Sequence, residues 1–544
     1  MADSTTTARA ILTHLIAHGV RTFVLCPGSR SAPFAYALYD AEQAGLVRLH
    51  VETDERVAGF VALGAGSVGE LTAVVTTSGS AVANLHPAVE EAFYAGVPLI
   101  VLSSDRPHHM RGVRASQTTD HQAVLAGSVR DFREFPAGGS LTNVGGLIRR
   151  IVGGARGEHL GTVPGPVHLN VGFIEPLMPE IRWESVVVDV EQAQHRDIGG
   201  EGDRTVRCVV VAGSTVVHQN LNFSHFVGVP ILAEPSASLR NHPNAVVAHP
   251  IVLSSQLRAQ INRVVVVGHP TLTREISALL ADPNVEVYIL DDVPTYADVA
   301  GRGQVIDVED LDAVLVHDQE WLVAWQAASQ AAENHISSHA TDFSFATIGR
   351  EISKHSMHLP LVVGASSIIR EINLYAPLPA PPVHANRGLA GIDGTMSSAL
   401  GIALATGKAV RVALGDVTFV HDLGALVHTA HQQSLDLDVV MIDDAGGSLF
   451  ATLEYGTGQE ASYDRVFRTQ KELDVAAYAQ AVGATYEPVD DVEQLRQVLS
   501  GVPVGVRIIH VRLGHTSMRA DRALRTQRRA HVLDAVHRRL NDFQ

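Results

Sequence analysis

Two acidic segments of the sequence have the residue types and spacing of a divalent-cation site. Asp416 follows one short apolar run, and residues 443–447, an Asp-Asp-Ala-Gly-Gly sequence, follow another. Asp416 and Asp444 are 28 residues apart, about one strand–helix–strand unit, so both carboxylates would lie at the same edge of a parallel sheet. Two carboxylates with nearby carbonyl oxygens suit Mg²⁺, which usually also binds phosphate oxygens and water. Gly446 and Gly447 would allow the backbone to approach that metal and a diphosphate closely.

A single Gly-Asp pair after a strand is usually only part of a turn, but two such sites at this separation favour a metal–diphosphate site. Another glycine-rich segment, residues 63–69 (LGAGSVG), matches the dinucleotide-binding pattern G-x-G-x-x-G. That pattern needs a strand before it and a helix after it, and here the order is reversed. These glycines therefore predict the end of a helix and a tight turn into the next strand.

The segments that must position these residues alternate between short apolar strands and amphipathic helices. The alternation predicts an α/β protein of three domains, each a mostly parallel sheet covered by helices, over residues 1–185, 186–335 and 336–544. A polar stretch at residues 192–205 predicts a linker. The predicted strands are residues 21–26, 47–51, 72–77 and 98–103 in the first domain, 206–213, 264–270 and 285–290 in the second, and 361–366, 410–416, 438–447 and 506–512 in the third.

Composition argues against several other classes of protein. The chain has 544 residues, 46% of them hydrophobic and 18% charged, which is typical of a globular protein. A net charge of −17 without a basic run argues against nucleic acid and acidic membranes as partners. No run approaches eighteen apolar residues, and the N-terminal segment has helical spacing rather than the pattern of a signal peptide. Two cysteines, Cys26 and Cys208, fit a reducing compartment, so we expect a cytoplasmic protein without membrane insertion.

The two acidic segments resemble the diphosphate-binding motif of thiamine diphosphate (ThDP) enzymes, and TDERVAG (53–59) resembles their glutamate motif. Six further segments narrow the resemblance to the 2-succinyl-5-enolpyruvyl-6-hydroxy-3-cyclohexene-1-carboxylate synthases of menaquinone biosynthesis. They occur in both outer domains, in the order found in that family, and the central domain adds only VVGHPTLTR (266–274). The six are CPGSRSAP (26–33), TSGSAVANLHPAV (77–89), PLIVLSSDRP (98–107), GASSIIRE (364–371), NRGLAGIDGT (386–395) and GDVTFVHDLGAL (415–426).

The resemblance implies roles for the matching residues. Glu55 would pair with the aminopyrimidine ring of ThDP and share a proton with it, although an acid at a helix N-terminus can also simply interact with the helix dipole. Mg²⁺, or Mn²⁺ in its place, would be held by Asp416, Asp444 and the carbonyl of Gly446. The cofactor itself would contact Ser78, Gly79, Asp416, Gly446, Gly447, Leu449 and Phe450. Members of the family build each active site from two subunits, so the resemblance also implies a homodimer or homotetramer.

The same resemblance implies decarboxylation of 2-oxoglutarate and conjugate addition of the resulting succinyl carbanion to isochorismate. Each of these substrates carries two carboxylates, and a protein of net charge −17 must hold them with local positive charge. The planar fork of arginine suits that task. By resemblance, isochorismate would contact Ser29, Arg30, Arg274, Ser366 and Arg370, and the keto acid would contact Arg106, Gln117 and Arg387.

Some features leave alternatives open. Asp443 and Asp444 stand where many ThDP enzymes have asparagine, and an extra carboxylate can either tighten a metal site or repel diphosphate. We expect His421, His428 and His431 on one helix as a polar face, because no acid or cysteine completes a zinc site.

One alternative function is that of another ThDP enzyme, such as an acetohydroxyacid synthase or a 2-oxoacid decarboxylase. The other is a non-catalytic binding protein with the same fold.

Overall fold

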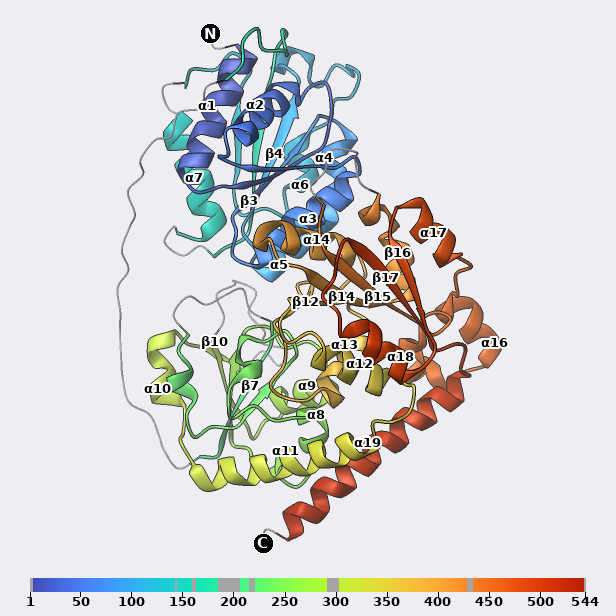
Figure 1. Ribbon diagram of the computed structural model, residues 1–544. Helices are drawn as coiled ribbons and strands as arrows, with labels where there is room; N and C mark the ends of the chain where they lie inside the picture. The colour runs from blue at the N-terminus through green and yellow to red at the C-terminus, as the bar shows by residue number, and fades with distance from the viewer. Residues whose placement is uncertain are drawn as a thin grey trace. The chain divides into compact units, whose positions relative to one another are not determined.

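The computed structural model describes residues 3–141, 144–158, 163–183, 206–214, 221–290, 303–427 and 434–542. Their strands form three parallel sheets, each with helices packed against it (Figure 1). The chain divides into two compact units. Unit 1 consists of residues 1–195, 388–408 and 422–435, and unit 2 consists of residues 196–387, 409–421 and 436–544.

Unit 1 contains a six-stranded sheet with the strand order β2-β1-β3-β4-β6-β5. Every neighbouring pair of strands is parallel. The strands are β1 (Thr22–Leu25), β2 (Arg48–Val51), β3 (Thr72–Thr76), β4 (Leu99–Asp105), β5 (Phe132–Phe135) and β6 (Pro166–Gly172). The helices are α1 (Ser4–Ala17), α2 (Ala32–Gln43), α3 (Glu55–Ser67), α4 (Ser80–Asn84), α5 (His86–Ala95), α6 (His121–Leu125), α7 (Val144–Arg156) and α14 (Thr395–Thr406).

The helices of unit 1 cover both faces of its sheet, as apolar strands require. On one face, α1, α2 and α7 bury Ile11, Leu38 and Ile148 against alternate strand residues such as Phe23 and Val75. On the other face, α3 contacts β1 and β3 and packs against α5 and α14 (Figure 1). This second layer brings the first turn of α3, where Glu55 lies, to the carboxyl end of the sheet.

Glycines allow α3 and α14 to approach each other at backbone distance. A Cβ on Gly64 would lie 2.1 Å from the carbonyl oxygen of Ser398, and a Cβ on Gly401 would lie 1.9 Å from that of Val61. The helix ends at Ser67, and Gly69, with φ +88°, leads into β3. The prediction for residues 63–69 is therefore confirmed: these glycines pack and end a helix, and they precede a strand.

Unit 2 contains a five-stranded sheet, β11-β10-β9-β7-β8, and a six-stranded sheet, β13-β12-β14-β15-β17-β16. The first consists of β7 (Cys208–Ala212), β8 (Ile231–Ala233), β9 (Arg263–Val267), β10 (Glu286–Leu290) and β11 (Gln304–Val305). The second consists of β12 (Leu361–Val363), β13 (Val383–His384), β14 (Val410–Gly415), β15 (Leu437–Asp443), β16 (Thr485–Val489) and β17 (Val506–Arg512). All neighbouring strands in both sheets are parallel.

The helices of unit 2 bury the faces of these sheets. Helices α8, α9, α11 and α19 share a core with β7, β9 and β10, and α12, α13 and α18 share one with β12, β14, β15 and β17. Their bounds are α8 (His249–Val252), α9 (Arg274–Leu280), α10 (Leu311–Val314), α11 (Gln319–His339), α12 (Phe345–Lys354), α13 (Ser367–Tyr375), α15 (Asp416–His421), α16 (Glu460–Tyr463), α17 (Val475–Ala481), α18 (Val492–Leu499) and α19 (Met518–Asn541).

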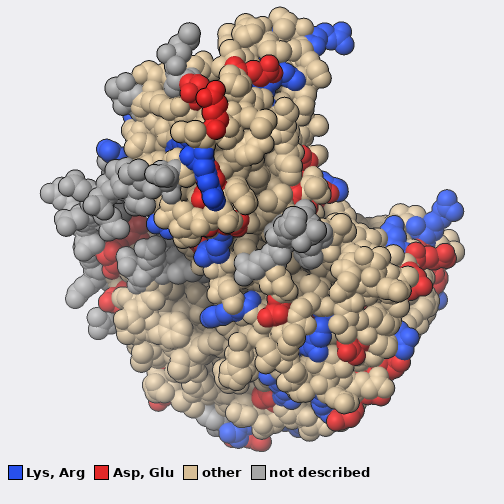
Figure 2. All heavy atoms as spheres, turned by 45° about the horizontal axis from the view of Figure 1, so that its top comes forward, with Lys and Arg blue, Asp and Glu red and all other residues tan. Residues whose placement is uncertain are grey.

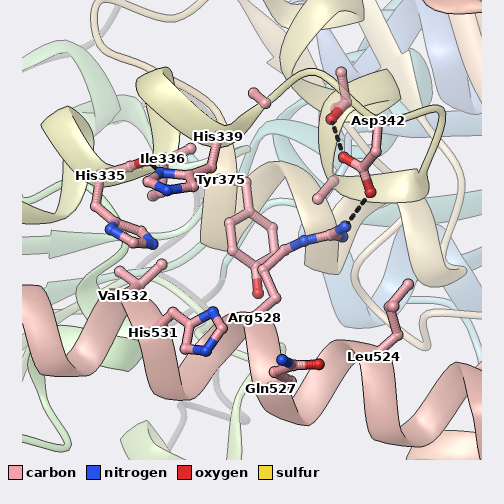
Figure 3. A pocket seen from close by; sticks show the side chains of 13 residues that line it. His335, Ile336, His339, Asp342, Tyr375, Leu524, Gln527, Arg528, His531 and Val532 are labelled. Carbon is pink, nitrogen blue, oxygen red and sulfur yellow. Dashed lines mark hydrogen bonds and ion pairs between the residues drawn. The ribbon is translucent and has the colours of Figure 1, made fainter.

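The long helices α11 and α19 lie side by side and border a pocket (Figure 3). His335 and His339 of α11 and His531 of α19 line it, and Arg528 donates a hydrogen bond to Asp342 at 2.5 Å. None of the residues that line this pocket is a predicted site residue. The described helices include none that is long and apolar enough to cross a membrane.

The three parallel sheets confirm the predicted fold class, and each predicted strand overlaps an observed one. The domain boundaries remain predictions. Residue 185 and the proposed linker at 192–205 lie outside the described residues, and residue 335 falls inside α11.

The single histidine-bearing helix expected from residue 421 onward is wrong. Helix α15 ends at His421, and a 3₁₀ turn at Leu423–Leu426 replaces its continuation. Val427 then has extended backbone angles, φ −91° and ψ 95°. His428 and His431 lie outside the described residues. The helix ends here because Asp422 and Gly424 are residue types that favour turns over helix interiors. The prediction considered only the spacing of the histidines and so overlooked these two residues.

Positive and negative side chains are interspersed on the face drawn in Figure 2. Some charges are buried instead. Arg411 in β14 and Asp438 in β15 are both fully buried, and Asp438 also accepts hydrogen bonds from Arg507 in β17 at 2.6 and 2.8 Å. These three residues lie opposite one another in adjacent strands. The carboxylate thus compensates two guanidinium groups inside the sheet.

We expect Asp438→Asn to lower the free energy of unfolding by about 3–5 kcal/mol, because it leaves Arg411 buried without a counter-charge. The matched control is Asp490→Asn, which breaks the half-exposed pair with Arg512 and should cost less than about 1 kcal/mol. Urea titration of both variants measures the difference. An equal loss of unfolding free energy in the two variants would show that the buried ion pair contributes no more to stability than the half-exposed one.

Candidate active site

Asp416 and Asp444 lie at the carboxyl ends of two neighbouring strands. Asp416 begins α15 directly after β14, and Asp444 is the first residue after β15. These strands pair in parallel, with Gly415 opposite Ile442, so both acids lie at the same edge of the sheet. Their exposed fractions are only 9% and 8%. This is the edge at which open α/β sheets bind ligands.

The negative charges of these two carboxylates lie near each other, and few positive charges of the chain balance them. Burial raises the pKa of Asp416 to about 6, and the charge of Asp443 adds to the shift. Burial also raises the pKa of Asp444 to about 7, with a further contribution from the charge of Asp416. Oδ2 of Asp444 is buried and has no hydrogen-bond partner within the described part of the chain. An orphaned carboxylate oxygen beside a second buried carboxylate fits a hard divalent cation.

Asp443 is directed elsewhere. Its Oδ1 accepts a hydrogen bond from the amide of Ala445 at 3.0 Å, and its Oδ2 lies 3.0 Å from Nε2 of His510. The hydrogen bond with His510 holds the pKa of Asp443 below its ordinary value. Of the two neighbouring acids, Asp444 is therefore the one with an oxygen available to a metal. The described residues contain no group of three or more His, Cys, Asp or Glu side chains that would hold a metal by themselves.

The loop after β15 needs glycine. Ala445 and Gly446 have φ values of +63° and +114°, and a Cβ on Gly446 would lie 2.3 Å from the carbonyl oxygen of Arg468. The amide of Gly447 donates to the same carbonyl at 2.7 Å. Leu449 and Phe450 follow in a 3₁₀ turn (Ser448–Thr452) and are half-buried. Phe450 packs against Phe467, with their ring centroids 5.7 Å apart.

Arg525 of α19 reaches the same loop, which the sequence analysis did not anticipate. Its Nη2 donates to the hydroxyl of Ser448 at 3.3 Å, and its Nη1 bonds Glu371 at 2.7 Å. A side-chain hydrogen bond from Ser448 in turn opposes the rise in the pKa of Asp444. Arginines are frequent along α19, so the sequence offered no means to single this one out.

Unit 2 also holds four of the predicted substrate residues. Arg387 is 3% exposed, and its Nε donates to the hydroxyl of Thr271 at 2.9 Å. Arg370 lies on the first turn of α13 and donates to the carbonyl of Ser366 at 2.9 Å. The hydroxyl of Ser366 is buried and has no hydrogen-bond partner among the residues described. Arg274 begins α9 and is exposed.

Two groups of predicted residues meet in unit 1. In the first, Glu55 opens α3 and its Oε2 accepts a hydrogen bond from the amide of Asn84 at 3.0 Å. Ser78 and Gly79 lie in the loop before α4, and the hydroxyl of Ser78 donates to the carbonyl of Gln117 at 2.8 Å. The side chain of Gln117 donates back to the carbonyl of Ser78 at 3.1 Å. Gly79 has φ +84°, and a Cβ there would lie 2.9 Å from Gln117.

The second group consists of Ser29, Arg30 and Arg106. Arg30 is buried and donates to the carbonyl of Phe173 at 3.1 Å. Burial lowers the pKa of Arg30, and the positive charge of Arg106 lowers it further, so the two guanidinium groups are near each other. Ser29 is exposed in the loop between β1 and α2. The charges of Glu175, whose Oε1 lies 3.8 Å from Nη2 of Arg30, and of Asp105 oppose this effect on the pKa of Arg30.

A buried polar network connects these groups in unit 1. The amide of Gly79 donates to Nε2 of His121 at 3.1 Å, and Nδ1 of His121 lies 2.9 Å from Oδ1 of Asn170. Nδ2 of Asn170 donates to Asp105 at 3.0 Å, and the other oxygen of Asp105 accepts from the amide of Arg106 at 2.7 Å. Sequence reasoning missed this network because its members are far apart in the chain and form no local motif.

Two regions of the chain match models of known protein families. Residues 5–124 match the family described as "Thiamine pyrophosphate enzyme, N-terminal TPP binding domain", and residues 368–507 match the corresponding C-terminal TPP binding domain. These two regions contain Glu55 and the Asp416–Asp444 pair, respectively.

Full-length relatives give a narrower assignment. A protein of Nocardioides sp. is 40% identical over 93% of this chain and 94% of its own length, and one of Kineococcus radiotolerans is 39% identical over 94% and 96%. A protein of Rhodococcus erythropolis is 36% identical over 95% and 98%. Each of the three is named 2-succinyl-5-enolpyruvyl-6-hydroxy-3-cyclohexene-1-carboxylate synthase. The chain therefore belongs to the thiamine pyrophosphate enzymes and, among them, to the family of 2-succinyl-5-enolpyruvyl-6-hydroxy-3-cyclohexene-1-carboxylate synthases.

Proposed function

We propose that the protein decarboxylates 2-oxoglutarate and adds the resulting four-carbon unit to isochorismate. The product is 2-succinyl-5-enolpyruvyl-6-hydroxy-3-cyclohexene-1-carboxylate, an intermediate of menaquinone biosynthesis. The observation that carries the proposal is identity of 36–40% over nearly the whole length of synthases of that name. The buried, poorly compensated pair of Asp416 and Asp444 supports it, since a diphosphate cofactor needs a metal at this edge of the sheet.

The residues of unit 2 fit the metal and the diphosphate. We propose that Asp416, Asp444 and the carbonyl of Gly446 hold Mg²⁺, for which Mn²⁺ can substitute, and that Gly447 borders the diphosphate. Leu449 and Phe450 give the bound cofactor an apolar support. ThDP, when bound, supplies the electron sink that makes loss of CO₂ from a 2-oxo acid feasible. The protein contributes the position, the charge and the exclusion of water.

Glu55 is the proposed acid–base residue. The side-chain amide of Asn84 orients its carboxylate, and Asn84 ends α4, the helix that begins directly after Ser78 and Gly79. A carboxyl at this point holds or releases one proton at a ring nitrogen of the aminopyrimidine.

The arginines are the proposed carboxylate receptors. Arg106 and Arg387, with Gln117, would bind 2-oxoglutarate, and Arg30, Arg274 and Arg370, with Ser29 and Ser366, would bind isochorismate. Arg30 and Arg387 are nearly inaccessible to water, where a charge-assisted hydrogen bond to a carboxylate is strong. We further propose a cytoplasmic homo-oligomer in which two subunits complete each active site.

An activity assay tests the proposed reaction directly. With ThDP and Mg²⁺, we expect CO₂ release from 2-oxoglutarate and no comparable release from pyruvate, and addition of isochorismate should give a coupled product detected by mass spectrometry. Preferential use of pyruvate would instead support an acetohydroxyacid synthase or a decarboxylase. ThDP binding without CO₂ release from either acid would support the non-catalytic alternative.

Removal of the proposed acid–base group should affect turnover rather than folding. We expect Glu55→Gln to bind ThDP normally and to lose about 10²–10⁴-fold in kcat, the usual contribution of a positioned acid or base. The control is Glu158→Gln, which changes a half-exposed glutamate of unit 1 and should retain full activity. Undiminished turnover in Glu55→Gln would remove this residue from the mechanism.

The same variant tests the shared active site. Glu55 is in unit 1 and Asp416 is in unit 2. Glu55→Gln therefore removes the proposed acid–base group, and Asp416→Asn removes a proposed metal ligand, each from a different unit. If two subunits complete each site, mixed dimers regain one intact site, and random reassociation restores about a quarter of wild-type activity. If each chain completes its own sites, the mixture stays inactive.

Metal affinity should distinguish the two adjacent acids. We expect Asp444→Asn to weaken Mg²⁺ binding by well over about a hundredfold and Asp443→Asn to weaken it by about tenfold, the low end for a residue that bonds behind the ligands, because the oxygens of Asp443 bond Ala445 and His510. Calorimetric titration with Mg²⁺ in the presence of ThDP measures both values. The proposed ligand set is wrong if the two variants lose affinity equally.

The pH dependence of metal binding follows from the raised pKa values of about 6 for Asp416 and about 7 for Asp444. Below these values protons occupy the carboxylates and compete with Mg²⁺. The apparent affinity should therefore rise from about pH 5.5 to about pH 8 and then level off, with protons released on binding. Titrations in buffers of different ionisation enthalpy count those protons. A flat profile would contradict the assignment.

A further inference from the structure

Glu234 is a buried carboxylate close to two of the proposed substrate arginines, and the mechanism above does not use it. It directly follows β8 and is 1% exposed. Its Oε1 accepts hydrogen bonds from the amides of Thr271 at 2.8 Å and Leu272 at 2.7 Å. Its Oε2 is buried and has no hydrogen-bond partner in the described parts of the chain. A charge so placed is costly unless it serves the site around it.

The contacts of Thr271 connect this carboxylate to Arg387. The hydroxyl of Thr271 accepts a hydrogen bond from Nε of Arg387 at 2.9 Å and a second one from Nη2. Glu234 therefore fixes the backbone of the residue whose side chain orients the guanidinium. Three separate segments meet here: the end of β8, the loop between β9 and α9, and the loop after β13.

The charges at this point are also linked. Burial raises the pKa of Glu234 to about 7, and the positive charges of Arg387 and Arg370 oppose the rise. The negative charge of Glu234 in turn raises the pKa of Arg370, against the effects of burial and of Arg387. Glu234 thus lies within electrostatic reach of both arginines, and its negative charge reduces their mutual repulsion.

We propose that Glu234 is a positioning residue for the 2-oxo acid: through Thr271 it fixes the guanidinium of Arg387 in the orientation that receives a substrate carboxylate. This inference rests on the proposed function, because that function assigns Arg387 to the keto acid. It adds Glu234, which follows β8 of the five-stranded sheet, to the proposed substrate residues of unit 2. It also predicts that breaking the contacts among Glu234, Thr271 and Arg387 changes the KM for 2-oxoglutarate.

The test uses the holoenzyme and three variants. Glu234→Ala removes the acceptor for two amides, Thr271→Val removes the hydroxyl that holds Arg387, and Thr271→Ser restores that hydroxyl. We expect the first two to raise KM for 2-oxoglutarate about ten- to a hundredfold, the usual effect of losing a hydrogen bond to a charged group. For Thr271→Val, the KM for isochorismate, the Kd for ThDP and the melting temperature should all stay near wild type, and Thr271→Ser should behave as wild type.

Two further measurements distinguish positioning from general loss of structure. The KM of the double variant Glu234→Ala/Thr271→Val for 2-oxoglutarate should be no higher than that of the single variant with the higher KM, because both substitutions act through one guanidinium. The control Glu351→Gln changes another buried glutamate, which pairs with Arg496 on α18, and should leave KM unchanged. If Thr271→Val keeps the wild-type KM, or if the two effects add, the inference is overturned even where Glu234→Ala fails to fold.

A binding measurement separates this inference from the proposed function. Glutarate, a dicarboxylate that cannot be decarboxylated in this way, is titrated calorimetrically into wild type and into Thr271→Val. We expect weaker binding to the variant. A wild-type enzyme that binds glutarate but does not turn over 2-oxoglutarate would contradict the proposed reaction alone, whereas equal glutarate affinities in the two proteins would overturn the role of Glu234 and Thr271.

Discussion

Two carboxylates, Asp416 and Asp444, are buried at one edge of a parallel sheet without enough positive charge from the chain to balance them. Burial alone raises both pKa values, and each acid lies within the field of another. In water such a pair would separate, but here the strands fix both acids in place. The divalent cation that we propose would resolve the conflict, and its remaining positions would be open to phosphate oxygens. Without that cation the pair has an unfavourable electrostatic energy.

The backbone of the fold imposes this constraint. Parallel pairing of β14 and β15 brings their carboxyl ends together, and the positive φ values of Ala445 and Gly446 turn the chain so that Asp444 faces inward. Arg525 and Ser448 hold the far side of the loop, as His510 holds Asp443. In unit 1 a series of hydrogen bonds from Gly79 through His121 and Asn170 to Asp105 fixes the loops that carry Ser78 and Arg106. In both units the residues with a proposed chemical role depend on buried polar partners elsewhere in the sequence.

This dependence explains what the sequence predicted and what it did not. Apolar strands and their order follow from local patterns, so the three parallel sheets were predictable, as was the helix end at residues 63–69. The resemblance pointed to Asp444 rather than Asp443 as the metal ligand, but the residue pattern offered no physical reason for that choice, because the bond that occupies Asp443 comes from His510, 67 residues away in the chain. The roles of Glu234 and Arg525 depend in the same way on contacts with Thr271 and Ser448. The helix expected beyond His421 failed for a local reason, the turn-forming residues that follow it.

The most direct test of the metal site is a crystal structure of the protein grown with ThDP and Mn²⁺, with diffraction data collected at the manganese absorption edge. The account predicts one anomalous peak within about 2.3 Å of a carboxylate oxygen of Asp416, a carboxylate oxygen of Asp444 and the carbonyl oxygen of Gly446, with phosphate oxygens completing the shell. A manganese ion bound by Asp443, or ThDP bound without any metal between Asp416 and Asp444, would contradict it.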